Sequence, residues 1–433
     1  MKTKLGARLW SVLILVGISG QFAWTLENMY FNVFLYNTIS QNPDHIAAMV
    51  AASAITATLT TLIMGALSDR LGKRKVFISA GYILWGLTTA SFGFISPESA
   101  GALFPAANAA AAAAGLVIFM DCLMTFFGST ANDAAFNAFI TDNVPNDKRG
   151  KTEGVLAVLP LLSMLIIFGL FDGYTQRGEW KTFFAIFGLA VTAVGIISLF
   201  LVKDSPALAP RRDKYFETLI HGLRPSVIKS LPSLYWALAA FCVFSIAVQI
   251  FFPYLIIYIQ TYLGIDNYAI VLGVVLILAS VVSVVGGNIS DKVGKLRFLL
   301  PAGIVMFAGL IAMYFVRGML GAIIAGTVMM SGDLLVSAVL SGIVRDRTPR
   351  DLVGHFQGIR MIFAVMLPMI IGPFIGSAVI KGSDMTYMDM GQLKSVPTPG
   401  IFLAGAAVLI LVALPVWALI KKEKSGAKSE KEA

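Results

Sequence analysis

The sequence has little charge and few of the side chains that catalyse reactions or hold metal ions. Only 13% of its 433 residues are charged, whereas a soluble domain has roughly 25%. Three histidines and two cysteines are present, and Cys122 and Cys242 each lie in an apolar stretch with no partner at metal-ligand spacing. Glycine-rich phosphate-binding loops are also missing. These absences argue against an enzyme and predict neither a metal site nor a cofactor.

Long apolar runs occupy most of the chain, of which 57% is hydrophobic. A helix needs ~20 mostly apolar residues to cross a membrane, and twelve such segments fit between charged, proline or glycine residues. We expect them at residues 9–37, 45–67, 76–96, 107–141, 152–171, 180–202, 234–262, 268–287, 298–316, 320–344, 359–380 and 400–420. The sequence therefore predicts an all-α membrane protein embedded in a lipid bilayer.

The basic residues gather on alternate sides of the expected spans. Most of the 33 Lys and Arg residues fall in the two terminal segments and in every second connection. Because basic loops stay in the cytoplasm, we expect both termini there, in a bacterial inner membrane. The net charge of +9 then follows from topology, and we expect a monomer without a nucleic-acid partner. The first apolar run is too long for a signal peptide, so we expect an uncleaved first helix.

A repeated motif divides the chain into two halves. GALSDRLGKRK, residues 65–75, follows the second span, and GNISDKVGKLR, residues 287–297, follows the eighth. A weaker echo pairs DNVPNDKRG after the fourth span with DRTPRDLVG after the tenth. We expect six-helix bundles at 1–202 and 234–420, a cytoplasmic linker at 203–233, and a charged, disordered cytoplasmic tail at 421–433.

The first copy of this motif resembles the major facilitator superfamily signature between helices 2 and 3, Gly-x-x-x-Asp-Arg-x-Gly followed by basic residues. Span count and repeat extend the resemblance over the whole chain. It implies two pseudo-symmetric six-helix bundles and a secondary transporter working by alternating access, with Asp69 and Arg70 holding the cytoplasmic side shut. We expect Gly65 to allow close helix approach and Gly72 a tight turn. The gating candidates are Gly65, Asp69, Arg70, Gly72, Arg74, Asp291, Gly294 and Lys295.

Four acidic residues are expected inside spans, where a charge is costly. Asp133 lies about 14 Å along the fourth span from Asp142, close to the expected midplane. An acid there must face a cavity or a partner, as an ion-coupling site requires, so Asp133 is the first candidate for coupling to a proton or sodium ion. Glu27 and Asp333 are further candidates, and Asp121 is expected near water in an outer vestibule. The alternative is a carboxylate satisfied by a helix–helix hydrogen bond.

Amide and aromatic side chains of the first, fourth and seventh spans are expected to line the substrate cavity. Polar residues recur at helical spacing beside Trp24, whose ring offers a face for a sugar or an apolar ligand. Pro253 can bend the seventh span. The candidate substrate contacts are Trp24, Asn28, Asn32, Asn132, Asn137, Gln249 and Tyr254.

Two segments resemble one branch of the superfamily. TANDAAF, residues 130–136, with DKR at 147–149, resembles helix 4 of the glycoside-pentoside-hexuronide:cation symporters, and GQFAWTLE, residues 20–27, is similar to helix 1 of sucrose-type proton symporters. The resemblance implies proton- or cation-coupled symport of a sugar or glycoside, with Asp133 as a ligand. The second span has no acid before Asp69, unlike melibiose-type members. A lysolipid-like substrate, drug export, and a membrane receptor or scaffold are therefore the alternatives, in that order.

Overall fold

The computed structural model of the protein describes residues 6–205, 208, 224–348, 358–383, 385–389 and 392–432. Within these residues, twelve helical segments are long and apolar enough to cross a membrane. They cover Ala7–Ile39, Pro43–Leu71, Lys75–Phe94, Ala109–Asn143, Thr152–Gln176, Trp180–Leu201, Pro232–Tyr262, Tyr268–Ser290, Lys295–Phe315, Met319–Arg347, Gly358–Lys381 and Gly400–Lys422. The twelve predicted spans are confirmed to within a few residues at each end, and so is the helical membrane fold.

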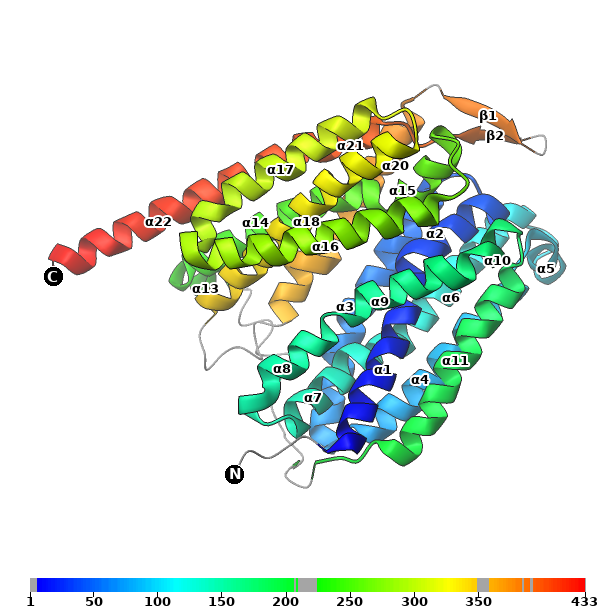
Figure 1. Ribbon diagram of the computed structural model, residues 1–433. Coiled ribbons are helices and arrows are strands. Elements are labelled where there is room, and N and C mark those ends of the chain that lie inside the picture. The colour runs from blue at the N-terminus through cyan, green and yellow to red at the C-terminus, as the bar shows by residue number, and fades with distance from the viewer. Residues whose placement is uncertain are drawn as a thin grey trace. The chain divides into compact units, whose positions relative to one another are not determined.

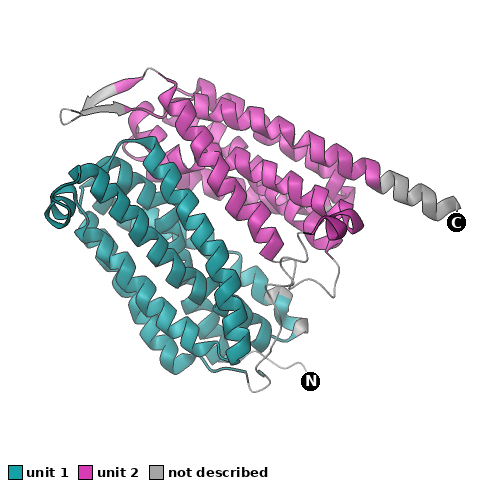
Figure 2. Cartoon of the chain, turned by 180° about the vertical axis from the view of Figure 1, so that it is seen from behind, with its two compact units in different colours: residues 1–213 teal, residues 214–433 magenta. Residues whose placement is uncertain are grey.

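The chain forms two compact units, residues 1–213 and 214–433 (Figure 2). The boundary lies inside the segment 203–233, where the sequence predicts a linker. Each unit contains six of the twelve spans.

Unit 1 is a bundle of helices whose ends follow local sequence signals (Figure 1). Its elements are α1 (Ala7–Thr25), η1 (Leu26–Tyr30), α2 (Phe31–Phe34), η2 (Leu35–Ile39), α3 (Pro43–Leu71), α4 (Lys75–Ser91), η3 (Phe92–Phe94), α5 (Pro97–Leu103), α6 (Ala109–Gly128), η4 (Ser129–Phe136), α7 (Asn137–Asn143), α8 (Asn146–Leu156), α9 (Leu159–Ile166), η5 (Ile167–Phe171), α10 (Asp172–Gln176) and α11 (Trp180–Leu201). The Asn42 side chain caps α3 by accepting a hydrogen bond from the Asp44 backbone N–H at 3.0 Å. Gly72 ends α3 with φ of 60°, a left-handed conformation that favours glycine, as the motif predicts.

Unit 2 contains the other six spans and a short hairpin. Its elements are α13 (Pro225–Ser230), α14 (Pro232–Phe251), η6 (Phe252–Tyr254), α15 (Leu255–Ile257), η7 (Tyr258–Tyr262), α16 (Tyr268–Val293), α17 (Lys295–Phe315), α18 (Met319–Arg347), η9 (Ile362–Met366), α20 (Leu367–Lys381), β1 (Thr386–Asp389), β2 (Gln392–Ser395), α21 (Gly400–Leu411) and α22 (Ala413–Glu432). The strands pair antiparallel, with Thr386 opposite Ser395. The tail predicted to be disordered continues α22 as far as Glu432, because its Lys, Glu and Ala residues favour a helix.

Several spans contain π-helical segments in place of regular α-helix. Among the described residues these are η1, η2, η4 and η5 in unit 1 and η7 and η9 in unit 2. Glu27 belongs to η1 and Asp133 to η4. Since π segments are rare and cluster at functional sites, two of the four coupling candidates lie on backbone of an unusual kind.

Glycines let helices pack closely in both units, but on different partners. A Cβ added to Gly86 in α4 would lie 2.4 Å from the Gly188 carbonyl oxygen in α11. A Cβ added to Gly309 in α17 would lie 2.3 Å from the Met329 backbone nitrogen in α18. The third span of unit 1 thus packs tightly on the sixth and, through Gly81, whose added Cβ would lie 2.6 Å from the Ala131 Cβ, also on the fourth. The third span of unit 2 makes such a glycine contact with the fourth span but, among the described residues, not with the sixth.

Candidate functional site

A pocket of about 300 Å³ lies in unit 1, among residues of the first, fourth and fifth spans. Its lining residues are Gly17, Gln21, Trp24, Asn132, Asp133, Phe136, Asn137, Ile140, Leu156 and Leu159. Three predicted substrate contacts, Trp24, Asn132 and Asn137, therefore share one pocket with the first coupling candidate, Asp133. No basic residue belongs to this lining.

Asp133 is held by neighbouring amides. Its Oδ1 accepts a hydrogen bond from Asn132 Nδ2 at 3.2 Å, and its backbone carbonyl accepts one from Asn137 Nδ2 at 3.1 Å. The hydroxyl of Tyr82 in α4 shares its one proton between the Val16 carbonyl at 2.9 Å and Asn132 Oδ1 at 3.1 Å. Tyr82 thus fixes the orientation of the Asn132 amide, which in turn directs its N–H toward the Asp133 carboxylate.

A pair of buried acidic residues, Glu27 and Asp121, also lies in unit 1. Glu27 is 7% exposed, and its Oε1 accepts hydrogen bonds from Ser53 Oγ at 2.5 Å and Thr125 Oγ1 at 3.0 Å. The Asp121 carboxylate interacts electrostatically with that of Glu27. Within the described residues, Glu27 Oε2 and Asp121 Oδ1 are buried without a hydrogen-bond partner. The site therefore holds two carboxylates with spare acceptor capacity for a proton or a cation.

The expectation that Asp121 lies near water is wrong. Asp121 is 1% exposed, because it lies one helical turn before Thr125 on the buried face of α6. Position along a helix indicates depth in the membrane but not which face of the helix meets water.

The remaining polar side chains of the first span form hydrogen bonds mainly within that span. The amide of Asn28 donates to the Trp24 carbonyl at 2.8 Å, and that of Asn32 donates to the Asn28 carbonyl at 2.9 Å. Thr25 approaches Ser163 of α9, with 3.2 Å between the hydroxyl oxygens. The single polar face predicted for this span is therefore divided between the pocket and helix contacts.

The candidates in unit 2 are more dispersed. Tyr254 is 1% exposed and donates its hydroxyl to the Pro373 carbonyl at 2.8 Å, so it packs the seventh span against the eleventh, in place of the predicted substrate contact. Gln249 packs against Gly372, where an added Cβ would lie 2.5 Å from the Gln249 Cβ. Asp333 is half-buried in α18.

Arg360, near the start of the eleventh span, is a charged residue of unit 2 that sequence reasoning did not name as a candidate. It lies in the span Gly358–Lys381 and donates from Nη2 to Ser341 Oγ of α18 at 3.3 Å. Ser341 is two turns beyond Asp333 on the same helix. A basic residue in the first turn of the predicted span 359–380 was a usable signal for such a contact.

The motif at 65–75 forms an ion cluster centred on Arg74, which is 4% exposed. Its guanidinium donates to Asp69, to Asp142 Oδ2 at 2.9 Å and to Ser68 Oγ at 2.5 Å. Burial alone lowers the pKa of Arg74, but the hydrogen bonds to Asp69 and Asp142 more than offset this and raise it above its ordinary value. The cluster ties together the ends of α3, α4 and α7.

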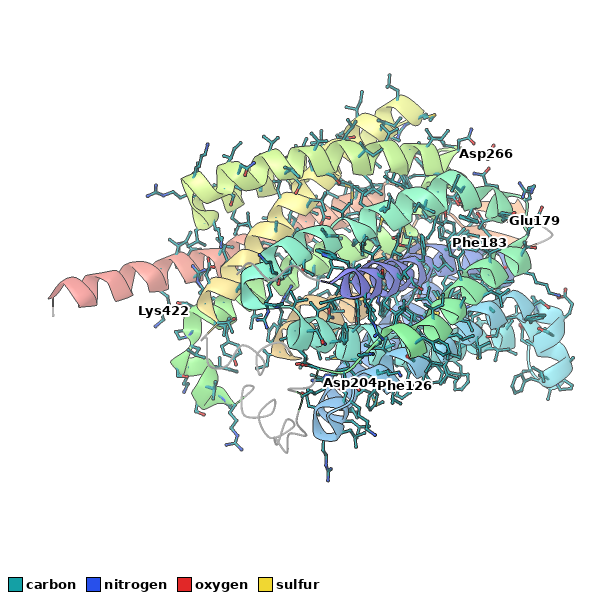
Figure 3. All side chains as sticks on the ribbon, turned by 60° about the horizontal axis from the view of Figure 1, so that its bottom comes forward. Phe126, Glu179, Phe183, Asp204, Asp266 and Lys422 are labelled. Atoms are coloured by element: carbon teal, nitrogen blue, oxygen red, sulfur yellow. The ribbon has the colours of Figure 1, made fainter. Side chains whose placement is uncertain are left out.

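Asp204 completes the cluster at the end of the sixth span (Figure 3). Its Oδ1 accepts hydrogen bonds from the backbone N–H groups of Arg74 at 2.8 Å and Lys75 at 2.9 Å. A carboxylate at this position caps the N-terminus of α4.

Arg70 is exposed, and the ion-pair partner of Asp69 is Arg74, so the gating role of Arg70 stays a prediction. The expectation for Gly65 is not met within unit 1: a Cβ added there would lie 3.9 Å from the Ala134 Cβ, an ordinary contact.

The second motif makes a simpler contact. Lys295 donates to Asp346 Oδ2 at 2.6 Å, and both side chains are partly exposed. Gly294 has φ of 96°, which favours glycine. Asp291 belongs to α16, but its side chain lies outside the described residues.

Sequence reasoning missed the partners of the acidic residues. Ser53 and Thr125 resemble ordinary small residues of apolar spans, and no local pattern marks them. Asp142 and Asp204 each follow the end of a span, where acids are less common than basic residues on the expected cytoplasmic side. An acid at such a position could therefore have been predicted to pair with the basic residues of the motif at 65–75.

Comparisons with known proteins agree with this architecture. The family model of the Major Facilitator Superfamily matches residues 12–373. The proline/betaine transporters of Escherichia coli strain K12 and Salmonella typhimurium strain LT2 are each 22% identical to this chain over 417 residues, covering 89% of this chain and 78% of the relative.

Solved structures show the same fold at low sequence identity. A nucleoside transporter aligns with a TM-score of 0.73 and 12% identity, covering 95% of this chain and 99% of that chain. A D-xylose–proton symporter aligns with a TM-score of 0.70 and 14% identity, covering 95% and 98%. Since the family model spans most of the sequence, the chain belongs to the Major Facilitator Superfamily and is a membrane transporter of small molecules rather than an enzyme.

Proposed function

We propose that the protein is a proton- or cation-coupled symporter that carries a neutral hydroxylated solute, such as a sugar or glycoside, by alternating access. The observation that supports this most is the pocket in unit 1, where Asp133 and the amides of Asn132 and Asn137 lie together with Trp24. Amides both donate and accept hydrogen bonds, as hydroxyl groups require. The indole face suits the apolar face of a sugar ring.

Coupling in this proposal takes place at Asp133. A carboxylate in a membrane span is costly while it is charged, and binding of a proton or cation from the pocket removes that cost. The buried carboxylate of Glu27 interacts electrostatically with that of Asp133 and with that of Asp121. Both termini are proposed to lie in the cytoplasm and the protein to act as a monomer in a bacterial inner membrane.

A zwitterionic ammonium solute is the second candidate. The proline/betaine transporters to which the chain is similar carry such a solute in their name, and a carboxylate near an indole ring suits an ammonium group. The absence of a basic residue from the pocket lining disfavours it, because the carboxylate of a zwitterion needs a cationic partner.

The first test is a ligand screen by thermal stabilisation of the purified protein, with and without sodium and across pH. Sugars, nucleosides, betaine and lysolipids are compared at equal concentration. Stabilisation by a hydroxylated solute supports the proposal, betaine alone favours the second candidate, and lysolipids alone favour an amphiphile carrier.

The second test measures coupling in proteoliposomes with an imposed pH or sodium gradient. Asp133→Asn keeps the side-chain size and mimics the neutral form, so uphill accumulation is lost while exchange of substrate across the membrane survives. Asp266→Asn, at an exposed acid outside the spans (Figure 3), is the matched control. Undiminished accumulation by Asp133→Asn would exclude Asp133 as the coupling residue.

A further inference from the structure

A larger cavity, of about 1010 Å³, lies in unit 2 between α17, α18, α21 and α22. Val336 of α18 is buried in it, and Ile304 of α17 and Val416 of α22 belong to its walls. Leu300 and Trp417 on its rim are 70% and 65% exposed. The volume is at the upper end of the range of small-molecule sites, but the lining is almost entirely apolar, so we distinguish it from the polar pocket of unit 1.

The helix packing of unit 2 accounts for this groove. Gly309 and Gly332 hold α17 against α18, with added Cβ atoms 2.3 Å from the backbone of the opposite helix. On its side toward α21 and α22, α17 is less closely packed. Gly303 lines the groove, and a Cβ added there would meet no atom within 4 Å.

One end of the groove is basic. Arg297, in the first turn of α17, lines the groove and is exposed. Lys421 of α22 lies over the Trp417 ring, with Nζ 5.2 Å from its centroid. The positive-inside pattern predicts that this end of both helices is cytoplasmic. The apolar groove thus ends at two cations and an indole, at the depth in the membrane where lipid headgroups lie.

We propose that this groove binds an anionic phospholipid, with an acyl chain along α17 and α22 and its phosphate at Arg297 and Lys421. Basic sites between spans on the cytoplasmic side suit anionic headgroups, and a guanidinium binds phosphate oxygens in a bidentate manner. A zwitterionic lipid would place its acyl chain in the same groove. Its headgroup has no net negative charge, so its electrostatic attraction to the two cations would be weaker.

The experiment uses the full chain, purified in detergent and given equal amounts of phosphatidylglycerol and phosphatidylcholine with the same acyl chains. Native mass spectrometry counts the retained lipids, and thermal unfolding reports stabilisation. Arg297→Gln removes the phosphate contact, and Gly303→Phe fills the groove without a backbone clash. The matched controls are Lys292→Gln, at an exposed basic residue on α16, and Gly287→Phe, where an added Cβ also meets no atom within 4 Å.

The parent and both controls should retain phosphatidylglycerol in preference to phosphatidylcholine. Arg297→Gln should retain roughly fivefold less, as expected for one cation near a membrane surface, and Gly303→Phe should lose retention of both lipids. Equal retention of the two lipids by the parent would overturn the proposal. So would equal stabilisation by inorganic phosphate alone, which would indicate a free anion site, or unchanged retention by Arg297→Gln.

Discussion

The two units share a motif and a span order, but they differ in how the third span of each is packed. In unit 1, α4 packs on α11 through Gly86 and Gly188, whereas in unit 2 α17 packs on α18 through Gly309. In unit 1 the third and sixth spans are therefore in close contact. In unit 2 the groove between α17, α21 and α22 stays open. A repeated fold therefore preserves helix order more strictly than it preserves helix contacts.

The two units also differ in their buried polar side chains. Unit 1 holds Glu27, Asp121 and Asp133 in a network of hydroxyl and amide groups. In unit 2, Asp333 is the acid predicted for coupling, and Arg360, near the start of its span, donates to Ser341. Ion-binding chemistry is thus concentrated in one half, whereas the larger apolar cavity lies in the other.

The packing difference predicts the largest effect on stability. Gly86→Val places a branched side chain against the backbone of α11 and should destabilise the protein by about 3 kcal/mol. Gly303→Val, in the repeat-related span, enters open space and should change stability by less than about 1 kcal/mol. Thermal unfolding of the two purified variants measures both, and equal losses would contradict the assigned contacts.

The two ion clusters predict an intermediate effect. Arg74→Ala leaves Asp69 and Asp142 without their cation, and because these acids are partly hydrated, the expected loss is about 2 kcal/mol, less than for a fully buried pair. Lys295→Ala breaks a more exposed pair and should cost less than about 1 kcal/mol. Unfolding midpoints in denaturant compare the variants. A larger loss from Lys295→Ala would reverse the ranking of the two clusters.

The smallest effect is expected in the connections that follow the fifth and ninth spans. The Arg177 guanidinium donates to Glu179 at 2.7 Å and lowers the pKa of that carboxyl. This contribution to stability is present above the pKa of unfolded Glu and is lost as the pH falls through the lowered pKa. Arg317 in unit 2 donates to the carbonyls of Tyr314 and Val316, which do not titrate.

Melting temperatures between pH 7 and pH 3 separate these two cases. The difference between the parent and Glu179→Gln should shrink toward low pH, whereas the difference between the parent and Arg317→Gln should stay constant over the same range. A constant difference for Glu179→Gln would show that the exposed pair does not contribute.

Hydropathy and charge predicted the spans because crossing a membrane imposes a minimum apolar length. The sequence also placed Trp24, Asn132, Asn137 and Asp133 near one another, and the structure brings them to one pocket. The sequence could not predict the hydrogen bonds of Glu27 with Ser53 and Thr125, because these contacts depend on how each helix is rotated about its own axis. Nor could it select Arg74 over Arg70 as the partner of Asp69, since both are close in sequence and only the turn at Gly72 decides between them.

The π-helical winding of η4 has a mechanical consequence for Asp133. A π segment closes each hydrogen-bonded ring with one residue more than an α-helix, and one residue of an α-helix corresponds to about 100° of rotation. Converting η4 to regular α-helix would therefore turn the following segment by about that angle relative to α6. Asp133 lies within η4, between Asp121 of the buried pair and Asn137 of the pocket. A local change of winding can thus redirect this carboxylate by a screw motion of part of one span, without tilting the whole helix.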